Sequence, residues 1–428
     1  MIGIVFLTFL VTILLALPLG LGMGFASLVP SLIRPSFVGD MEYILTSMAS
    51  GLNSTPILAI PLFMLSGVIM TKGGISKRLF DVFSLIVGTR TAGIPCAVII
   101  TCLFYGAISG SGPATCAAVG TMTIPILVRL GYDKKFAAAV VAVAAGLGVI
   151  IPPSIPFVMY GLFTGESIAD LFKAGVVPGC LIAACLMIYA YIYCKKNGED
   201  KQKIKENYLD LKARGWLHVV KDGFWALLTP VIILGSIYGG IVTPTEAACI
   251  SVVYALIVCL FIYKTIRWKD IWKLLKESVV SYAPICVLIG MAIAFMRVLI
   301  LLKATDVIGT LIANVMTNKV MLLITLNILL LFIGMFMDVG AAVIVIAPIL
   351  LPVAESMGID GIHLGITMVV NLAIGFVTPP FGVNLFVAAP LVDISVIELG
   401  KKVFPFIVAF LIALIAITFI PAISLCLV

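Results

Sequence analysis

Four long stretches of this sequence contain no charged side chain, and they constrain the fold more than any other feature. Residues 1–33, 91–128, 136–165 and 364–392 lack Asp, Glu, Lys and Arg. A membrane-spanning α-helix needs about 20 consecutive apolar residues, so each stretch is long enough to cross a bilayer. Hydrophobic residues make up 62% of the 428 positions and charged residues 11%. Membrane barrels consist of shorter alternating segments, so the sequence predicts an all-α polytopic membrane protein.

The distribution of charge, the cysteine spacing and the motif content argue against several other classes of protein. The net charge is +7, but most of it lies in loops, so it does not indicate a nucleic-acid-binding surface. Residues Lys195–Lys221 include eight Lys and Arg, which indicates a cytoplasmic loop. The ten cysteines show no CxxC spacing and are expected to be buried apolar residues. No Walker-A pattern occurs, and His218 and His363 do not form an HExxH motif, so we expect no enzyme.

Hydropathy and turn signals predict the remaining elements. The first apolar stretch lacks a basic n-region and is longer than a signal-peptide core, so we expect it to be a retained helix. Membrane spans are expected over residues 2–30, 54–70, 175–194, 224–241, 246–263, 279–302 and 403–427. Short amphipathic helices near the membrane interface are expected over residues 79–88, 264–276 and 306–315.

Two apolar helices are predicted to break inside the membrane. Pro379 and Pro380 remove two backbone donors, and Gly375 and Gly382 loosen the chain on either side. The segment 148–154 has the same character, with Pro152-Pro153 following a glycine. Freed backbone groups at this depth are tolerated only where they are buried in protein or line a water-filled cavity. Each break is therefore a candidate site.

Two further stretches are predicted to be hairpins. Residues 91–128 are interrupted at Gly106–Pro113, which leaves two arms that are too short to cross the bilayer comfortably. We expect a re-entrant hairpin with its tip at Ser109–Pro113. Residues 320–337 and 341–351 repeat this pattern around Asp338-Val-Gly340.

The two halves of the chain match at a constant offset of 227 residues. The pairs are Pro125 with Pro352, Gly131 with Gly358, Asp133 with Asp360, Gly148 with Gly375, and Pro152-Pro153 with Pro379-Pro380. At the same offset, Ser111 pairs with Asp338. Broken helices at equivalent positions of two repeats are typical of secondary transporters with a site at the membrane midplane. The sequence does not give the relative orientation of the repeats, and we infer inversion from this architecture.

Oxygen atoms gather at the predicted tips and breaks. Hydroxyls, carboxylates and freed carbonyls are the ligands that hard cations prefer, which suits sodium. The first half offers oxygens of Ser109, Ser111 and Ser154 and carbonyls of residues 148–151. The second half offers Asp338 and Thr378 and carbonyls near Gly334, Gly375 and Phe381. For any single Ser or Thr, a hydrogen bond to its own helix is the alternative.

Four polar residues have competing interpretations. Asp338 is an acid between apolar arms, and it is either a site residue or the cap of the following helix. Arg297 either binds a carboxylate or extends toward the interface. Glu246 completes a capping box with Thr243, so we assign it a structural role. Asn384 is a candidate ligand beside the second break, and the helix start at Gly112-Pro113 could receive an anion.

Five motifs together resemble the large membrane subunit of tripartite ATP-independent periplasmic (TRAP) transporters. They are GAISGSGPAT (106–115), IPPS (151–154), TPTEA (243–247), FMD (336–338) and TPPFGVN (378–384). The resemblance covers essentially the whole chain. It implies sodium-driven import of organic acids, commonly C4-dicarboxylates or sialic acid, across a bacterial inner membrane. It also implies a periplasmic binding protein, a small membrane subunit on a separate chain, and contact with membrane lipid.

The resemblance also implies an elevator mechanism and particular ligands. At least two sodium sites are expected, formed by Ser109, Ser111, Gly148, Ser154, Gly334, Asp338, Gly375, Thr378 and Phe381. Substrate is expected between them, at Ser111, Gly112, Pro113, Asp338, Thr378 and Asn384. The expected divisions are scaffold helices at 1–90, transport repeats at 91–180 and 316–402, a cytoplasmic loop with scaffold helices at 181–315, and a last helix at 403–428. The rival interpretations are a self-sufficient divalent-anion symporter and a channel.

Overall fold

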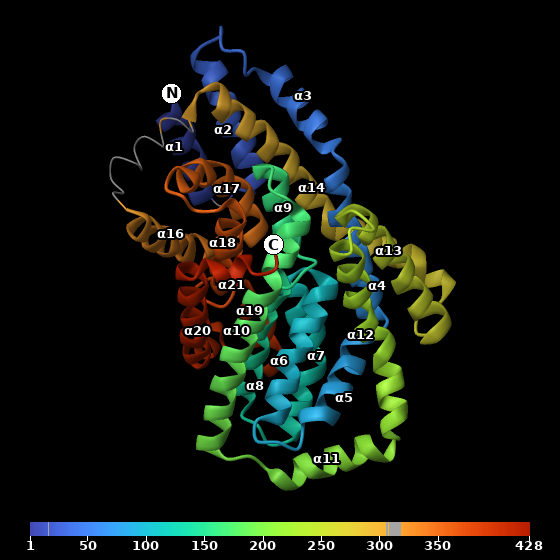
Figure 1. Cartoon of the computed structure of the whole chain (residues 1–428). Coiled ribbons are helices and arrows are strands. Elements are labelled where there is room, and N and C mark those ends of the chain that lie inside the picture. Colours follow the sequence, from blue (N-terminus) through green and yellow to red (C-terminus); the bar gives the residue numbers. More distant parts are fainter. Residues whose placement is uncertain (16, 305–306, 308–317) are drawn as a thin grey trace.

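The computed structural model describes residues 1–15, 17–304, 307 and 318–428, and all regular elements among them are helical (Figure 1). The predicted helix at 306–315 lies almost entirely outside the described residues. The helices of the first half are α1 (Ile2–Leu14), α2 (Leu19–Ile33), α3 (Met41–Leu52), α4 (Ala59–Lys72), α5 (Ile75–Val87), α6 (Gly93–Ser109), α7 (Gly112–Arg129), α8 (Lys134–Ala144), α9 (Ile155–Thr164) and α10 (Ile168–Asn197). The later helices are α11 (Lys201–Ala213), α12 (Trp216–Tyr238), α13 (Pro244–Ile257), α14 (Ile271–Leu301), α16 (Lys319–Gly334), α17 (Val339–Ser356), α18 (Gly361–Gly375), α19 (Val383–Ala388), α20 (Val396–Phe419) and α21 (Pro421–Leu425).

The chain is a multi-pass membrane protein. Seven of the described helices are long and apolar enough to cross a bilayer, namely those at Thr55–Lys72, Ile168–Asn197, Trp216–Tyr238, Pro244–Ile262, Trp268–Leu301, Val339–Ser356 and Val396–Phe419. Several shorter apolar helices accompany them, among them α6, α9, α16 and α18. Short apolar helices of this kind need protein around their ends, because the backbone groups there have no helical partners.

The prediction of a single span over residues 2–30 is wrong. The segment forms α1 and α2, which pack against each other, with Pro18 at the N-cap of α2. Proline cannot continue the hydrogen-bond ladder of a preceding helix, so it ends the first helix within an uncharged run. A second difference concerns residues 264–276, because Ile271 onward belongs to the long helix α14 rather than to a separate interfacial element. Helix α3, capped by Asp40, was not predicted.

Helix pairs lie where both hairpins were predicted, although α17 is longer than the predicted arm and is one of the seven helices long enough to cross a bilayer, and both predicted breaks are present. Helices α6 and α7 pack side by side with a turn at Gly110, and α16 and α17 form the second pair. Helix α8 ends at Ala144 and continues as a 3-10 helix over Ala145–Val149, and α-helix resumes only at Ile155. Helix α18 ends at Gly375, and regular helix resumes at Val383. Asp133 caps α8, because its carboxylate accepts from the backbone N–H of Lys135.

The hairpins and breaks pack into one body, and other helices flank it. Helices α6, α7, α8, α10, α18 and α20 share a continuous buried core. Helices α4, α12, α13 and α14 pack against one another on one side, and α5 joins them to α6. Helix α11 lies across one end of the molecule, where it packs against α5 and α12 (Figure 1). The small residues of α8 pack closely, since all its residues from Phe136 to Ala144 are buried.

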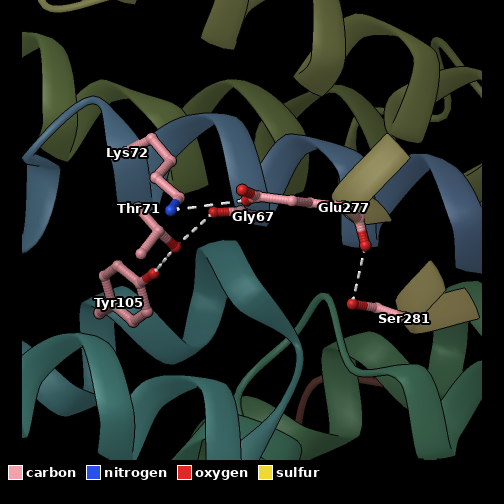
Figure 2. A network of polar contacts seen from close by, with 6 residues as sticks. All are labelled: Gly67, Thr71, Lys72, Tyr105, Glu277 and Ser281. Atoms are coloured by element: carbon pink, nitrogen blue, oxygen red, sulfur yellow. Dashed lines mark hydrogen bonds and ion pairs between the residues drawn. The ribbon is translucent and has the colours of Figure 1, made fainter. Parts of the chain in front are cut away.

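A buried polar contact joins α4 of the flanking helices to α6 of the first hairpin (Figure 2). The Thr71 hydroxyl donates to the Gly67 carbonyl at 2.6 Å, so its oxygen accepts from the hydroxyl of the fully buried Tyr105. At Gly67 an added Cβ would lie 3.2 Å from the Ser109 Cα, so the two backbones approach closely near the tip. Nearby, Lys72 and Glu277 form a partly exposed ion pair at 3.5 Å, whose contribution to stability is small.

The two partners of this contact are expected to respond differently to substitution. Thr71→Val leaves the buried Tyr105 hydroxyl without its acceptor, which costs about 1–3 kcal/mol. Tyr105→Phe removes the donor but leaves Thr71 bonded to Gly67, so its cost is expected to be about 1 kcal/mol or less. Thermal unfolding of the two variants and of the double variant in detergent measures the difference. Equal losses in the two single variants would contradict this account.

Candidate functional site

The first hairpin tip rests on the first helix break. An added Cβ on Gly106 would lie 2.6 Å from the Gly148 Cα, and one on Gly148 would lie 2.8 Å from the Ser111 carbonyl oxygen. Only glycine at both positions permits this approach of two backbones. Gly110 has a left-handed backbone with φ of 61°, which turns the chain between the arms. The first tip and the first break are therefore in direct contact.

Four oxygen-bearing side chains lie at this first contact. The hydroxyls of Ser109 and Thr115 are 2.8 Å apart, and Thr115 donates to the Ser111 carbonyl at 2.8 Å. The hydroxyl of the fully buried Ser154 donates to the Val149 carbonyl and accepts from the N–H of Phe157 at 3.4 Å. These neutral oxygens match the donor set that a hard monovalent cation needs.

Thr115 was not among the predicted site residues. It lies four residues after Ser111, so on a helix its side chain returns to the turn that contains the tip. That spacing was the signal that could have identified it.

The second hairpin meets the second break in the same way. An added Cβ on Gly375 would lie 2.2 Å from the carbonyl carbon and oxygen of Gly334. The Thr378 hydroxyl, half-buried within the break, donates to the Ile374 carbonyl at 2.8 Å. A hydrogen bond to its own helix is the alternative role given above for any single Ser or Thr. The Thr378 oxygen still keeps lone pairs that can coordinate a cation. The rings of Phe336 and Phe381 lie 5.2 Å apart and join the second tip to the break.

Asp338 both caps a helix and faces a cavity. Its carboxylate accepts from the backbone N–H of Gly340 at 2.9 Å, at the start of α17. The side chain is solvent-accessible and contributes to the wall of a small cavity. The capping role and the site role are therefore compatible at this residue.

The cavity lies where the two hairpin tips approach each other, and its volume is about 100 Å³. The first tip contributes Gly110, Ser111 and Pro113, and the second contributes Asp338, Val339, Gly340 and Ala341. Residues at the breaks add Val149, Ile155, Pro156 and Phe376, with Met159 on α9. Met64 of α4 and Ile285 and Leu288 of α14 form the opposite wall. One wall thus belongs to the hairpin body and the other to the flanking helices.

Three helices begin at this cavity. Helices α7, α9 and α17 start at Gly112, Ile155 and Val339, and residues of each first turn line it. The N-terminus of a helix carries unpaired N–H groups and a partial positive charge, which favours an anion. Neither Lys nor Arg is among the lining residues of the described chain. The arrangement can therefore receive an anion through backbone dipoles instead of side-chain cations.

Asn384, Arg297 and Glu246 lie elsewhere. Asn384 is fully buried and donates to the Ala142 carbonyl at 2.9 Å, so its side chain faces α8 and does not line the cavity. Arg297 donates to the Ser50 hydroxyl at 2.9 Å and joins α14 to α3. Glu246 forms the capping box with Thr243, as predicted. The two roles predicted for Arg297 were carboxylate binding and extension toward the membrane interface. Neither includes the contact with Ser50, which the sequence alone does not indicate.

The fold and the site together define a class of protein. A multi-pass helical chain with two hairpins, two broken helices and a cavity between the hairpin tips has the architecture of a secondary transporter. Residues 6–423 match the model of the family described as "Tripartite ATP-independent periplasmic transporter, DctM component". The chain therefore belongs to the large permease subunits of TRAP transporters.

Relatives with several named substrates match most of the chain. The chain is 41% identical to the isethionate TRAP transporter permease protein DctMQ of Oleidesulfovibrio alaskensis, over 97% of the chain and 65% of that protein. It is 40% identical to the C4-dicarboxylate large permease DctM of Pseudomonas aeruginosa, over 87% of the chain and 86% of the relative. The sialic acid large permease SiaM of Vibrio cholerae is 32% identical over 96% of the chain and 94% of the relative.

Solved structures share the fold at low sequence identity. The YdaH transporter of Alcanivorax borkumensis has a TM-score of 0.63 at 13% identity, covering 89% of this chain and 88% of that one. MtrF of Neisseria gonorrhoeae has a TM-score of 0.64 at 16% identity, covering 94% and 93%. At these identities the likeness concerns the fold alone.

Proposed function

We propose that this chain imports a small organic acid into the bacterial cell, driven by a sodium gradient. In this proposal it lies in the inner membrane and works with a periplasmic binding protein and a small membrane subunit. The observation that carries the proposal is the cavity between the two hairpin tips, where three helix N-termini meet without a cationic side chain. The helix N-termini favour a carboxylate or sulfonate over a cationic or neutral substrate once the charge of Asp338 is offset.

Asp338 gives a physical reason for coupling to a cation. An organic anion entering the cavity would lie close to the Asp338 carboxylate, and two like charges at short range repel each other. A sodium ion in one of the two oxygen-rich contacts would offset that repulsion. We assign one ion to the contact of Ser109, Ser111, Gly148 and Ser154, joined by Thr115. We assign a second ion to the contact of Gly334, Asp338, Gly375, Thr378 and the Phe381 carbonyl.

The orientation of the two halves supports an inverted repeat. The turn at Gly131, which precedes α8, packs near Asp200, just beyond the C-terminal end of α10. The equivalent turn precedes α18, and Gly361 lies against Glu166, just before the N-terminal end of α10. Helix α10 has 30 residues, a length of about 45 Å at 1.5 Å per residue. Helices α8 and α18 thus begin at opposite ends of the molecule, which fits repeats of opposite direction.

An elevator motion fits the placement of the cavity. In this proposal, residues 91–180 and 316–402 move as the transport unit against the scaffold of 1–90 and 181–315, with 403–428 at the end of the chain. The cavity wall from α4 and α14 belongs to the scaffold, and its three lining side chains, Met64, Ile285 and Leu288, are apolar. An apolar wall without hydrogen bonds to the substrate offers little resistance to sliding.

Leaving out components one at a time tests the TRAP assignment. In proteoliposomes, uptake is expected only when this chain, the small subunit and a loaded binding protein are all present. Sodium-driven uptake by this chain alone would instead support a self-sufficient divalent-anion symporter. Ohmic, non-saturating conductance would support a channel and overturn the transporter proposal.

The names of the relatives indicate which substrates to test first. Isethionate and C4-dicarboxylates are carried by the relatives at 41% and 40% identity, and sialic acid is carried by one at 32%. We therefore propose a small acid of the first two kinds. Thermal stabilisation of the cognate binding protein by a panel of organic acids identifies it, because a ligand raises the melting temperature of the state it binds.

Replacing Thr378 tests the second ion site. Thr378→Ala removes a neutral oxygen, and we expect the half-saturating sodium concentration for uptake to rise roughly tenfold, since a bond to a charged group is worth about 1.5–3 kcal/mol. Thr378→Ser keeps the hydroxyl and is the control. An unchanged sodium activation curve in Thr378→Ala would remove this residue from the site.

A further inference from the structure

A second cavity lies far from the transport site, at the end of the molecule that carries the basic loop. Its volume is about 400 Å³, and its lining residues come from the loop that joins α5 to α6, from Glu199 and from the first turns of α11. Figure 1 shows α11 at this end of the molecule. The lining residues are Thr89, Arg90, Thr91, Glu199, Lys201, Ile204, Lys205, Tyr208 and Leu209. The transport mechanism proposed above uses none of them.

Three cations line this cavity without an ion-pair partner among the described residues. Arg90, Lys201 and Lys205 are exposed, and none of them forms an ion pair with any described residue. Their neighbours on α11 are paired, because Lys203 contacts Asp200 at 3.2 Å and Gln202 donates to Glu206 at 3.3 Å. Lys201 and Lys205 are four residues apart, so they lie on the same face of the helix.

Glu199, the acid among the lining residues, already accepts hydrogen bonds from within the protein. The two carboxylate oxygens of Glu199 accept from the backbone N–H of Ala92 at 3.1 and 3.0 Å, and one of them accepts from the Tyr132 hydroxyl at 2.5 Å. Its charge is directed into the protein, where these bonds stabilise it. The open part of the cavity therefore presents three positive charges and the two threonine hydroxyls of the loop.

The position of the cavity favours a ligand that is anionic at one end and apolar at the other. Ile204 forms a buried floor, whereas Leu209 in the lining is 50% exposed. Ile86, at the end of α5 that leads into this loop, is also an exposed apolar side chain. Exposed apolar side chains beside a basic pocket fit the boundary between lipid headgroups and acyl chains. A free anion would not need the apolar rim.

We propose that this cavity binds the phosphodiester headgroup of an anionic phospholipid of the cytoplasmic leaflet. The Arg90 guanidinium matches the planar geometry of phosphate oxygens, and Lys201 and Lys205 add charge from α11. Bound lipid would hold α11 against the α5–α6 loop. Because α11 connects α10 of the hairpin body to α12 of the flanking helices, the lipid would stabilise this connection.

Lipid binding to the purified full-length chain in detergent tests the proposal. Phosphatidylglycerol is expected to raise the melting temperature, whereas phosphatidylcholine and inorganic phosphate at the same concentration are not. The triple variant Arg90→Gln, Lys201→Gln, Lys205→Gln is expected to bind phosphatidylglycerol more weakly by on the order of 100-fold, given about 1 kcal/mol for each basic residue near an anionic membrane surface.

A matched variant removes the same charge elsewhere. Lys269, Lys273 and Lys276 belong to the other basic stretch, are exposed, and form no ion pair with any described residue. Replacing these three with Gln is expected to leave the stabilisation close to that of the unmodified chain. Melting temperatures without lipid and elution profiles establish that both variants are folded. The proposal fails if both triple variants lose binding equally, if phosphatidylcholine stabilises equally, or if inorganic phosphate alone gives the full shift.

Discussion

Asp338→Asn is expected to reduce uptake by roughly tenfold or more while the protein stays folded. Asparagine is as good an N-cap as aspartate, so the hydrogen bond to Gly340 at the start of α17 is preserved. The change removes a carboxylate assigned to the second sodium ion, and a contact with a charged group is worth about 1.5–3 kcal/mol. The measurement is the initial rate of uptake in proteoliposomes, together with the melting temperature in detergent.

Asp360→Asn is the matched control for this variant. Asp360 also caps a helix through its carboxylate, by accepting from the N–H of His363 at 3.0 Å, but it does not line the cavity. We expect uptake by the control to stay near that of the unmodified chain. Normal uptake by a normally expressed Asp338→Asn protein would limit Asp338 to capping and would remove the charge argument for sodium coupling.

Gly375→Ala is expected to disrupt the contact between the second hairpin and the second break. The added Cβ would lie 2.2 Å from the carbonyl carbon and oxygen of Gly334, and backbone atoms cannot rotate away as a flexible side chain can. Overpacking of this kind costs about 1–3 kcal/mol, and here it also displaces the carbonyls assigned to an ion. Both a lower melting temperature and a weaker sodium dependence of uptake are therefore expected.

Gly235→Ala is the control for the steric argument. Gly235 lies in α12, and apart from its chain neighbours and the backbone of its own helix no described atom lies within 4 Å of an added Cβ. Alanine is preferred to glycine in a helix by about 1 kcal/mol, so this variant is expected to be neutral or slightly stabilised. If both glycine variants behaved alike, the close approach of Gly334 and Gly375 would not be the cause of the effect.

Much of the fold could be predicted from residues that each have a single structural explanation. The paired prolines and their glycines locate both breaks, because proline cannot donate the missing hydrogen bonds. The capping box of Thr243 and Glu246 is recognisable in the sequence, and it is present in the structure. The division of residues 2–30 was missed because the run carries no charge, although Pro18 marked the division. Helix α3 was missed because its composition is mixed, although Asp40 stood at its N-cap.

The residues that form the walls of the site are harder to predict from the sequence than those at the hairpin tips. Turn and break residues are recognisable because few residue types fit them, so Ser111, Gly148 and Asp338 were located in advance. The direction of a side chain depends on the rotation of its helix, and the rotation of α19 turns Asn384 toward Ala142. Met64, Ile285 and Leu288 look like lipid-facing residues in sequence, since apolar protein walls and lipid tails select the same side chains.

Uptake under an imposed sodium gradient tests the central claim most directly. The complete system, with this chain, its small subunit and a loaded binding protein, is placed in proteoliposomes with sodium outside, with equal sodium on both sides, or with sodium inside only. We predict concentrative, saturable uptake of the organic acid only with the inward gradient. Accumulation that is equal in all three conditions would contradict sodium coupling through the site between the hairpin tips.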